Sequence, residues 1–227
     1  DPGRINSLAD LSKIPPTEKR HLQEYNEDFL CVSRAEIREY TTTSGTLGEP
    51  LTIALTQKDL DRLAYNEWLS FHCMGITAQD TVQLMLTLDR QFMAGVAYYG
   101  GLQKTGAAVV RTGPGQADMQ WDRIHKLRTT ALVAVPSFLV KLIATAPAAY
   151  NIRNAPLLKV LAIGENLRDE QLRPNALAQK ITSQWNVQLF GTYAATEMQT
   201  AFTECVAGQG GHHHPELLIV ELLDEKN

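Results

Sequence analysis

The chain has 227 residues, of which 44% are apolar and 20% are charged, so it can bury a sizeable core. Its formal net charge of −4 gives no basic footprint for nucleic acid. No apolar run is long enough to span a bilayer and no secretory leader begins the sequence, so we expect no membrane partner. The three cysteines form no CxxC pair and no even set, which favours a reducing compartment and predicts a cytoplasmic protein.

Strand-like and helix-like patterns alternate along the chain, which is typical of an α/β fold. Residues 51–55 are predicted to form a strand. Thr56 then suits the N-cap of a helix, with Asp59 three residues later, apolar residues at helical spacing up to Phe71, and Gly75 at its end. Further strands are predicted at residues 81–86, 107–110, 131–135, 157–163, 187–190 and 217–223. Further helices are predicted at residues 92–104, at 119–127 and, capped by Ser137, through Ile143, with a surface loop at 146–156.

A loop rich in glycine and hydroxyl side chains precedes the first of these strands. Glycine lets backbone N–H groups approach a ligand closely, and Thr and Ser hydroxyls add donors beside them, so the loop suits phosphate oxygens. It lacks the Lys-Ser or Lys-Thr pair of a P-loop. Taken alone, such a stretch is more often a hairpin connection. The candidate phosphate-binding residues are Thr43, Ser44, Gly45, Thr46 and Gly48.

Two further motifs follow predicted strands. Gly164, Glu165 and Asn166 come directly after the strand at 157–163, and residues 193–197 follow the strand at 187–190. In open parallel sheets, ligands dock just beyond the carboxyl ends of the strands. The sequence therefore predicts that both motifs line one ligand site.

The order of the three motifs resembles the adenylate-forming, acyl-CoA synthetase-like superfamily, within it the phenylacetate-CoA ligase and coenzyme F390 synthetase branch. That family carries an SSGTTGKP-like phosphate loop, a GAEP-like adenine loop and a YGxSE or YGxTE motif. The resemblance extends to the N-terminal segment 8–22, to Pro136-Ser137-Phe138, to Glu204-Cys205 and to residues 210–224. It runs over essentially the whole chain in the right order.

This resemblance implies an α/β fold of the layered αβα type with a mostly parallel sheet, the large N-terminal domain of an adenylate-forming enzyme. After Asn227 the family continues with a strand, a ribose-binding Asp, a hinge and a small mobile domain with a catalytic Lys. We therefore expect residues 1–227 to be a partial AMP-binding domain, with the C-terminal domain not present and little activity alone.

The resemblance also implies ATP-dependent activation of a carboxylic acid to an acyl-adenylate, followed by thioester formation with coenzyme A. Adenine would lie between the loop at 164–166 and the motif Tyr193, Ala194 and Ala195. Thr196 would reach the α-phosphate, and Glu197 would support Mg²⁺, a hard cation that prefers oxygen. Without the neighbouring motifs, Tyr193 would be an ordinary strand-end aromatic and Glu197 a solvated carboxylate.

Several positions depart from the family pattern. Glu49 stands where the phosphate loop usually has Lys, which places an anion near the polyphosphate and weakens the case for tight ATP binding. Leu47 replaces a Thr, and Ala194 replaces the Gly of YGxTE. Glu165-Asn166-Leu167 replaces Ala-Glu-Pro, which shifts the acid by one position. These changes indicate a divergent branch, and the identity of the acid stays open.

For the acyl group, Phe92, Gly95 and Phe138 align with positions where the family builds the pocket wall. An aromatic slot with a small residue would suit an aryl or short acyl acid. The alternative is that Phe92 and Phe138 are ordinary core residues of amphipathic helices. The two interpretations stay open at this point.

Cys205, His212 and His214 supply one thiolate and two imidazoles within a short span, ligand types that suit Zn²⁺. In an extended segment, His212 and His214 point to the same side and His213 points away. The alternative is an exposed polar loop with a buried free Cys205.

Three functions are compatible with the sequence. The first is the carboxylate-CoA ligase, with ATP/AMP, Mg²⁺ and coenzyme A as its ligands. The second is a nucleotide- or acyl-binding module without chemistry, which Glu49 favours, and the third is acyl transfer to an acceptor other than CoA. A homodimer is retained as an option for the oligomeric state.

Overall fold

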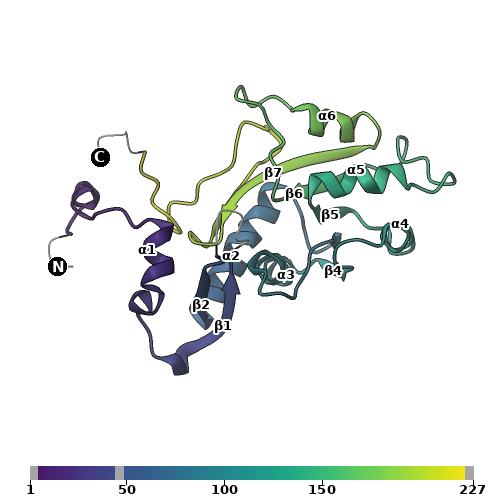
Figure 1. Cartoon of the computed structure of the whole chain (residues 1–227). Coiled ribbons are helices and arrows are strands. Elements are labelled where there is room, and N and C mark those ends of the chain that lie inside the picture. The colour runs from purple at the N-terminus through teal and green to yellow at the C-terminus, as the bar shows by residue number, and fades with distance from the viewer. Residues whose placement is uncertain (1–4, 44–48, 223–227) are drawn as a thin grey trace.

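The computed structural model describes residues 5–43 and 49–222 (Figure 1). Ser44, Gly45, Thr46 and Gly48, to which sequence analysis assigned phosphate binding, lie outside the described residues, as does Leu47. No helix in the described ranges is both long and apolar enough to cross a bilayer.

A mostly parallel sheet forms the centre of the fold, as predicted. Its strand order is β4-β3-β5-β6-β7-β8, and only β8 runs antiparallel to its neighbour. The strands are β3 (Thr81–Leu84), β4 (Ala108–Arg111), β5 (Ala131–Ala134), β6 (Leu158–Ala162), β7 (Val187–Ala195) and β8 (Thr200–Thr203).

Helices cover both faces of this sheet, which confirms the αβα layers (Figure 1). Along β5, Ala131 and Val133 pack against one helical layer, while Leu132 and Ala134 pack against the other. Side chains alternate between the faces of a strand, so a strand covered on both sides is apolar throughout. One layer is α2 (Gln57–Cys73) and α3 (Met93–Thr105), and the other is α4 (Ala117–Lys126), α5 (Pro136–Ala144) and α6 (Ala176–Thr182).

A separate hairpin precedes α2. Its strands β1 (Ile37–Thr42) and β2 (Thr52–Thr56) pair antiparallel. Thr56 caps α2 as expected: its hydroxyl accepts from the Asp59 N–H at 3.4 Å, and Asp59 accepts from the Thr56 N–H at 2.7 Å. Upstream lie α1 (Lys19–Glu24) and short 3-10 turns at Leu8–Lys13, Asn26–Phe29 and Arg34–Glu36.

The structure differs from the sequence prediction in three local respects. Helix α6 was not predicted, because seven residues show little periodicity; the Asn175 side chain caps it by accepting from the Ala178 N–H at 3.0 Å. Helix α5 begins at Pro136, so Ser137 lies inside its first turn and is not its cap. Residues 217–222 do not form the predicted strand, because no strand of the described residues pairs with them.

Candidate functional site

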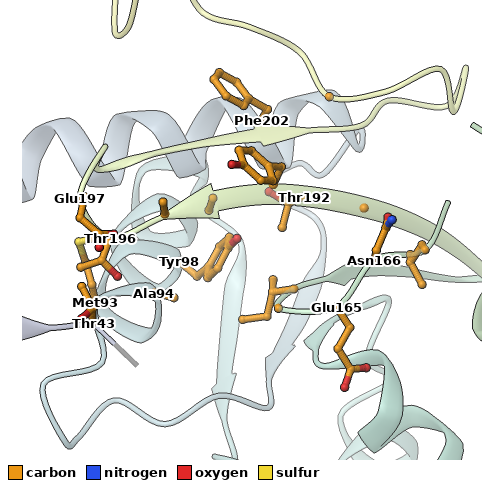
Figure 2. Close-up of a pocket in the computed structure, with 18 of the residues that line it drawn as sticks. Thr43, Met93, Ala94, Tyr98, Glu165, Asn166, Thr192, Thr196, Glu197 and Phe202 are labelled. Atoms are coloured by element: carbon orange, nitrogen blue, oxygen red, sulfur yellow. The ribbon is translucent and has the colours of Figure 1, made fainter. Parts of the chain in front are cut away.

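A large cleft opens at the carboxyl ends of the parallel strands (Figure 2). Its volume is about 1190 Å³, which is enough for a nucleotide together with a second small molecule. It is built from α1, the β1–β2 hairpin, the start of α3, the loop after β6, the end of β7 and part of β8 with the segment after it. The described residues that line it include Lys19, Thr43, Arg90, Phe92, Met93, Ala94, Tyr98, Ile163, Gly164, Glu165, Asn166, Arg168, Gly191, Thr192, Tyr193, Ala194, Ala195, Thr196, Glu197, Phe202 and Glu204.

Tyr193 offers an aromatic face to this cleft. It is 68% exposed, and its ring stacks parallel on that of Phe202, with the centroids 6.2 Å apart. The motif was predicted to be a loop after the strand, but Tyr193, Ala194 and Ala195 belong to β7 itself. Pairing with the antiparallel β8 extends the strand, since Tyr193 lies opposite Phe202 in the ladder. The exposed side of the ring can stack on a flat heterocycle.

The loop after β6 turns at Gly164, whose φ of +75° favours glycine. The Glu165 carboxylate points away from the cleft toward α5 and accepts from the Ser137 N–H at 2.7 Å, which satisfies a free donor at the start of that helix (Figure 2). The Asn166 side chain bonds the backbone of Arg168, accepting at 3.1 Å and donating at 2.9 Å. Both side chains therefore fix the shape of the loop, and its backbone is left to face a ligand.

A buried ion pair joins this loop to β7 and β8. Arg168 donates through Nε and Nη2 to the two carboxylate oxygens of Glu204 at 2.8 and 2.9 Å, and Glu204 also accepts from the Gly191 N–H at 3.0 Å. The hydrogen bond to Glu204 raises the pKa of Arg168. The Glu204 side chain is only 5% exposed, so three segments that line the cleft depend on one carboxylate.

Glu197 and Thr43 lie at the other end of the cleft (Figure 2). The Lys19 ammonium lies 3.1 Å from the Glu197 carboxylate, which brings α1 to the site. The Thr43 N–H donates to the Leu51 carbonyl at 3.0 Å, and the Thr43 hydroxyl accepts from the Leu51 N–H at 3.0 Å. The Gln91 carbonyl ties the hairpin to the segment just before α3 by accepting from the Thr41 hydroxyl at 2.7 Å.

The oxygen donors at this end suit Mg²⁺. That ion usually takes one or two protein carboxylates and completes its shell with water and substrate phosphates. Glu197 supplies a carboxylate and Thr196 a hydroxyl next to it in the cleft. The Lys19 contact was missed by the sequence analysis, which used Lys19 only as part of the N-terminal segment.

Comparison with known proteins assigns this chain to a family. The sequence profile of the AMP-binding enzyme family matches residues 20–217. The chain belongs to the AMP-binding enzyme family.

Two curated members of the family are phenylacetate-coenzyme A ligases. That of Aromatoleum evansii is 30% identical over 140 residues, which is 61% of this chain and 32% of that enzyme. That of Escherichia coli K12 is 27% identical over 143 residues, or 63% of this chain and 32% of the enzyme. The chain thus spans about a third of the length of these relatives.

Solved structures confirm the fold of the large AMP-binding domain. An open conformation of 2-hydroxyisobutyryl-CoA ligase in complex with 2-HIB-AMP and CoA superposes with a TM-score of 0.74 at 20% identity, covering 90% of this chain and 46% of that one. ATP-bound MatB from Rhodopseudomonas palustris gives a TM-score of 0.55 at 16% identity, covering 77% and 32% of the two chains.

Of the three residues predicted to form the wall of an acyl pocket, one lines the cleft of this AMP-binding domain. Phe92 lines the cleft. Gly95 does not: a Cβ there would lie 2.0 Å from the Thr87 carbonyl oxygen, so this glycine lets α3 approach the backbone after β3. Phe138 packs with α4 to α6 on the opposite face of the sheet. Met93, Ala94 and Tyr98 also line the cleft, and the sequence analysis did not single them out.

Beneath these residues α2 buries a carboxyl group. Glu67 is 5% exposed, and burial raises its pKa to about 8, so it is mostly protonated at neutral pH. Tyr98, 2% exposed, has its pKa raised well above 10, first by burial and then by the nearby Glu67. Both groups are therefore neutral under physiological conditions.

The zinc expectation is not supported. The described ranges contain no group of three or more His, Cys, Asp or Glu side chains placed to hold a metal ion. Cys205 accepts from the Ala207 N–H at 3.5 Å, His213 bonds the Leu218 carbonyl, and His212 is exposed. The segment turns at Pro215 instead of running on as a strand. The polar loop is the better description, with Cys205 half-buried.

Proposed function

We propose that this AMP-binding domain belongs to a carboxylic acid–CoA ligase, in which ATP activates an acid to an acyl-adenylate and coenzyme A then takes the acyl group. The observation that supports this best is that Tyr193, the loop at Gly164 and Glu197 line one cleft at the sheet edge. Its relatives are phenylacetate-coenzyme A ligases, which suggests an aryl or short acyl acid.

Neither half-reaction needs a protein nucleophile. The substrate carboxylate attacks the α-phosphate and releases pyrophosphate, and the thiol then displaces AMP. The chain's contribution is positioning and charge stabilisation. Tyr193 and the loop backbone would hold adenine, the Thr196 hydroxyl would donate to the α-phosphate, and Lys19 and Arg90 would supply positive charge beside the phosphates. Bound at Glu197, Mg²⁺ would neutralise phosphate charge.

We further propose that residues 1–227 form only part of the catalytic unit and that a small mobile domain completes the site, as closing elements do in other enzymes. A second candidate function is a binding module without chemistry. Glu49, in place of the expected Lys, favours it, and transfer to an acceptor other than CoA is a third.

Tyr193→Ala should lower the affinity for both AMP and ATP by about tenfold, because stacking of a base on an aromatic ring contributes on the order of 1–3 kcal/mol to binding. Calorimetric titration of each nucleotide into the complete gene product measures this. Tyr25→Ala, which removes an exposed tyrosine outside the cleft, is the control and should leave both affinities unchanged. Absence of binding by either nucleotide at millimolar concentration would sink the proposed function.

Glu49→Lys should raise the affinity for ATP by about fivefold and the affinity for AMP much less. The reason is that reversing one charge close to the β- and γ-phosphates changes the binding free energy by on the order of 1 kcal/mol in water. Glu49 is exposed, and its contact with Gln23 uses the backbone carbonyl, so the fold should tolerate the change. Asp118→Lys on α4 makes the same net charge change away from the cleft and should alter neither affinity. Equal gains for ATP and AMP would show that Glu49 lies elsewhere.

A further inference from the structure

Helix α2 lies along β8, and the two elements run in the same direction. The Asn66 side chain accepts from the Ala201 N–H at 2.8 Å and donates to the Ala201 carbonyl at 3.2 Å. About one turn further along α2, the Ser70 hydroxyl lies 2.9 Å from that of Thr203. A step of four residues on the helix therefore matches a step of two residues on the strand.

The next step along this line brings two cysteines together. A step of seven residues, like one of four, returns to the same face of a helix, and every second residue lies on the same face of a strand. Cys73, the last residue of α2, is seven residues after Asn66, and Cys205 is two residues after Thr203. The register therefore places the two side chains opposite each other. Burial raises the pKa of the Cys73 thiol, and the nearby Cys205 raises it further.

Both thiols are free, and both cysteines are half-buried, so a small oxidant can reach them. A disulfide needs Cα atoms within about 7 Å of each other, which is the spacing of residues whose short side chains touch, as those of Ser70 and Thr203 do. The Cys205 sulfur accepts from the Ala207 N–H at 3.5 Å. Because sulfur is a weak acceptor, giving up this bond costs little.

We propose that Cys73 and Cys205 form a reversible disulfide that fastens the chain after β8 to the end of α2 under oxidising conditions. With hydrogen peroxide as the oxidant, one thiolate attacks the peroxide, becomes a sulfenic acid and releases hydroxide. The second thiolate attacks that sulfur, the S–S bond forms, and the sulfenic oxygen leaves as a second hydroxide. The two thiols lose two electrons and two protons, and the peroxide ends as two waters.

Such a bridge would stabilise the fold and leave the cleft open. It joins residues far apart in the sequence, and a cross-link that closes a long loop restricts the unfolded chain most. Side chains alternate along β8, so Thr203 and Cys205 face α2, whereas Phe202 and Glu204 line the cleft. Oxidation should therefore raise stability without changing nucleotide binding. This inference does not depend on the ligase function.

The test compares the complete gene product after treatment with hydrogen peroxide and after reduction with dithiothreitol. We expect mass spectrometry to find a tryptic peptide that links Cys73 to Cys205 in the oxidised sample and not in the reduced one. The urea unfolding midpoint should rise by about 1 M on oxidation. Cys73→Ser and Cys205→Ser should each abolish the linked peptide and the rise. Cys31→Ser, which removes an exposed cysteine, is the control and should keep both.

The proposal is wrong if no peptide links Cys73 to Cys205, if either cysteine pairs with a different partner, or if Cys73→Ser keeps the rise in midpoint. AMP affinity should agree within about twofold between the reduced and oxidised samples. A tenfold loss on oxidation would show that Cys205 faces the cleft and not α2. If the reduced protein does not bind AMP, the ligase function fails, while the linked peptide and the unfolding midpoint still decide this proposal.

Discussion

Glu204→Ala should lower the free energy of unfolding by about 3–5 kcal/mol, the usual cost of removing one partner of a buried ion pair. The loss is large because two donors are orphaned together: the Arg168 guanidinium and the Gly191 N–H both bond this carboxylate. The loop after β6 would also lose its tie to β7, so nucleotide affinity should fall along with stability.

Urea unfolding followed by circular dichroism gives the stability change. Arg173→Ala is the matched control, since it breaks an exposed ion pair with Asp169 in the same loop, with the Arg173 side chain 70% exposed. Exposed pairs contribute little, so the control should keep the unfolding midpoint of the unsubstituted protein. A Glu204→Ala midpoint as high as that of the control would show that the pair does not hold these segments together.

Gly95→Ala should destabilise the fold by about 1–3 kcal/mol or more, the range for overpacking a well-packed interior. The added Cβ would lie 2.0 Å from the Thr87 carbonyl oxygen and 3.2 Å from the Leu88 Cα, and backbone atoms cannot rotate away as a side chain can. Helix α3 would have to shift as a whole. Its first turn lines the cleft, so binding should weaken for every acid alike.

The comparison is Gly113→Ala, where no atom lies within 4 Å of the added Cβ but φ is +67°. Backbone strain alone then costs about 1 kcal/mol. We expect the Gly95 variant to unfold at a clearly lower urea concentration. If it kept its stability and changed only the choice of acid, Gly95 would be a pocket residue, as its alignment with the family first suggested.

Much of the layered fold can be read from local patterns. The apolar run at β5 and the runs at β3 and β6 predict buried strands, because a strand covered on both faces needs apolar side chains throughout. The Thr56 cap followed by a helical period predicts α2. The positions of the motifs after β6 and at the end of β7 indicate a site at the carboxyl edge of the sheet.

Several site residues could not be predicted in this way. The period of α3 shows that Gly95 and Tyr98 face inward, but Gly95 meets the Thr87 backbone and Tyr98 meets the cleft. Phe138 has an apolar helical pattern and packs on the far face of the sheet. Which of the inward-facing residues contact a ligand is decided only by how the neighbouring helices and strands pack.

The sequence by itself determined the α/β class, the core strands and the order of the nucleotide motifs, because these depend on hydrophobic periodicity and on residue types at short spacing. Tertiary structure alone decided the extension of β7 through β8 and the Arg168–Glu204 and Lys19–Glu197 pairs. The physical reason is that these contacts join residues far apart in the chain. Each depends on how helices and strands pack, and no local pattern encodes that.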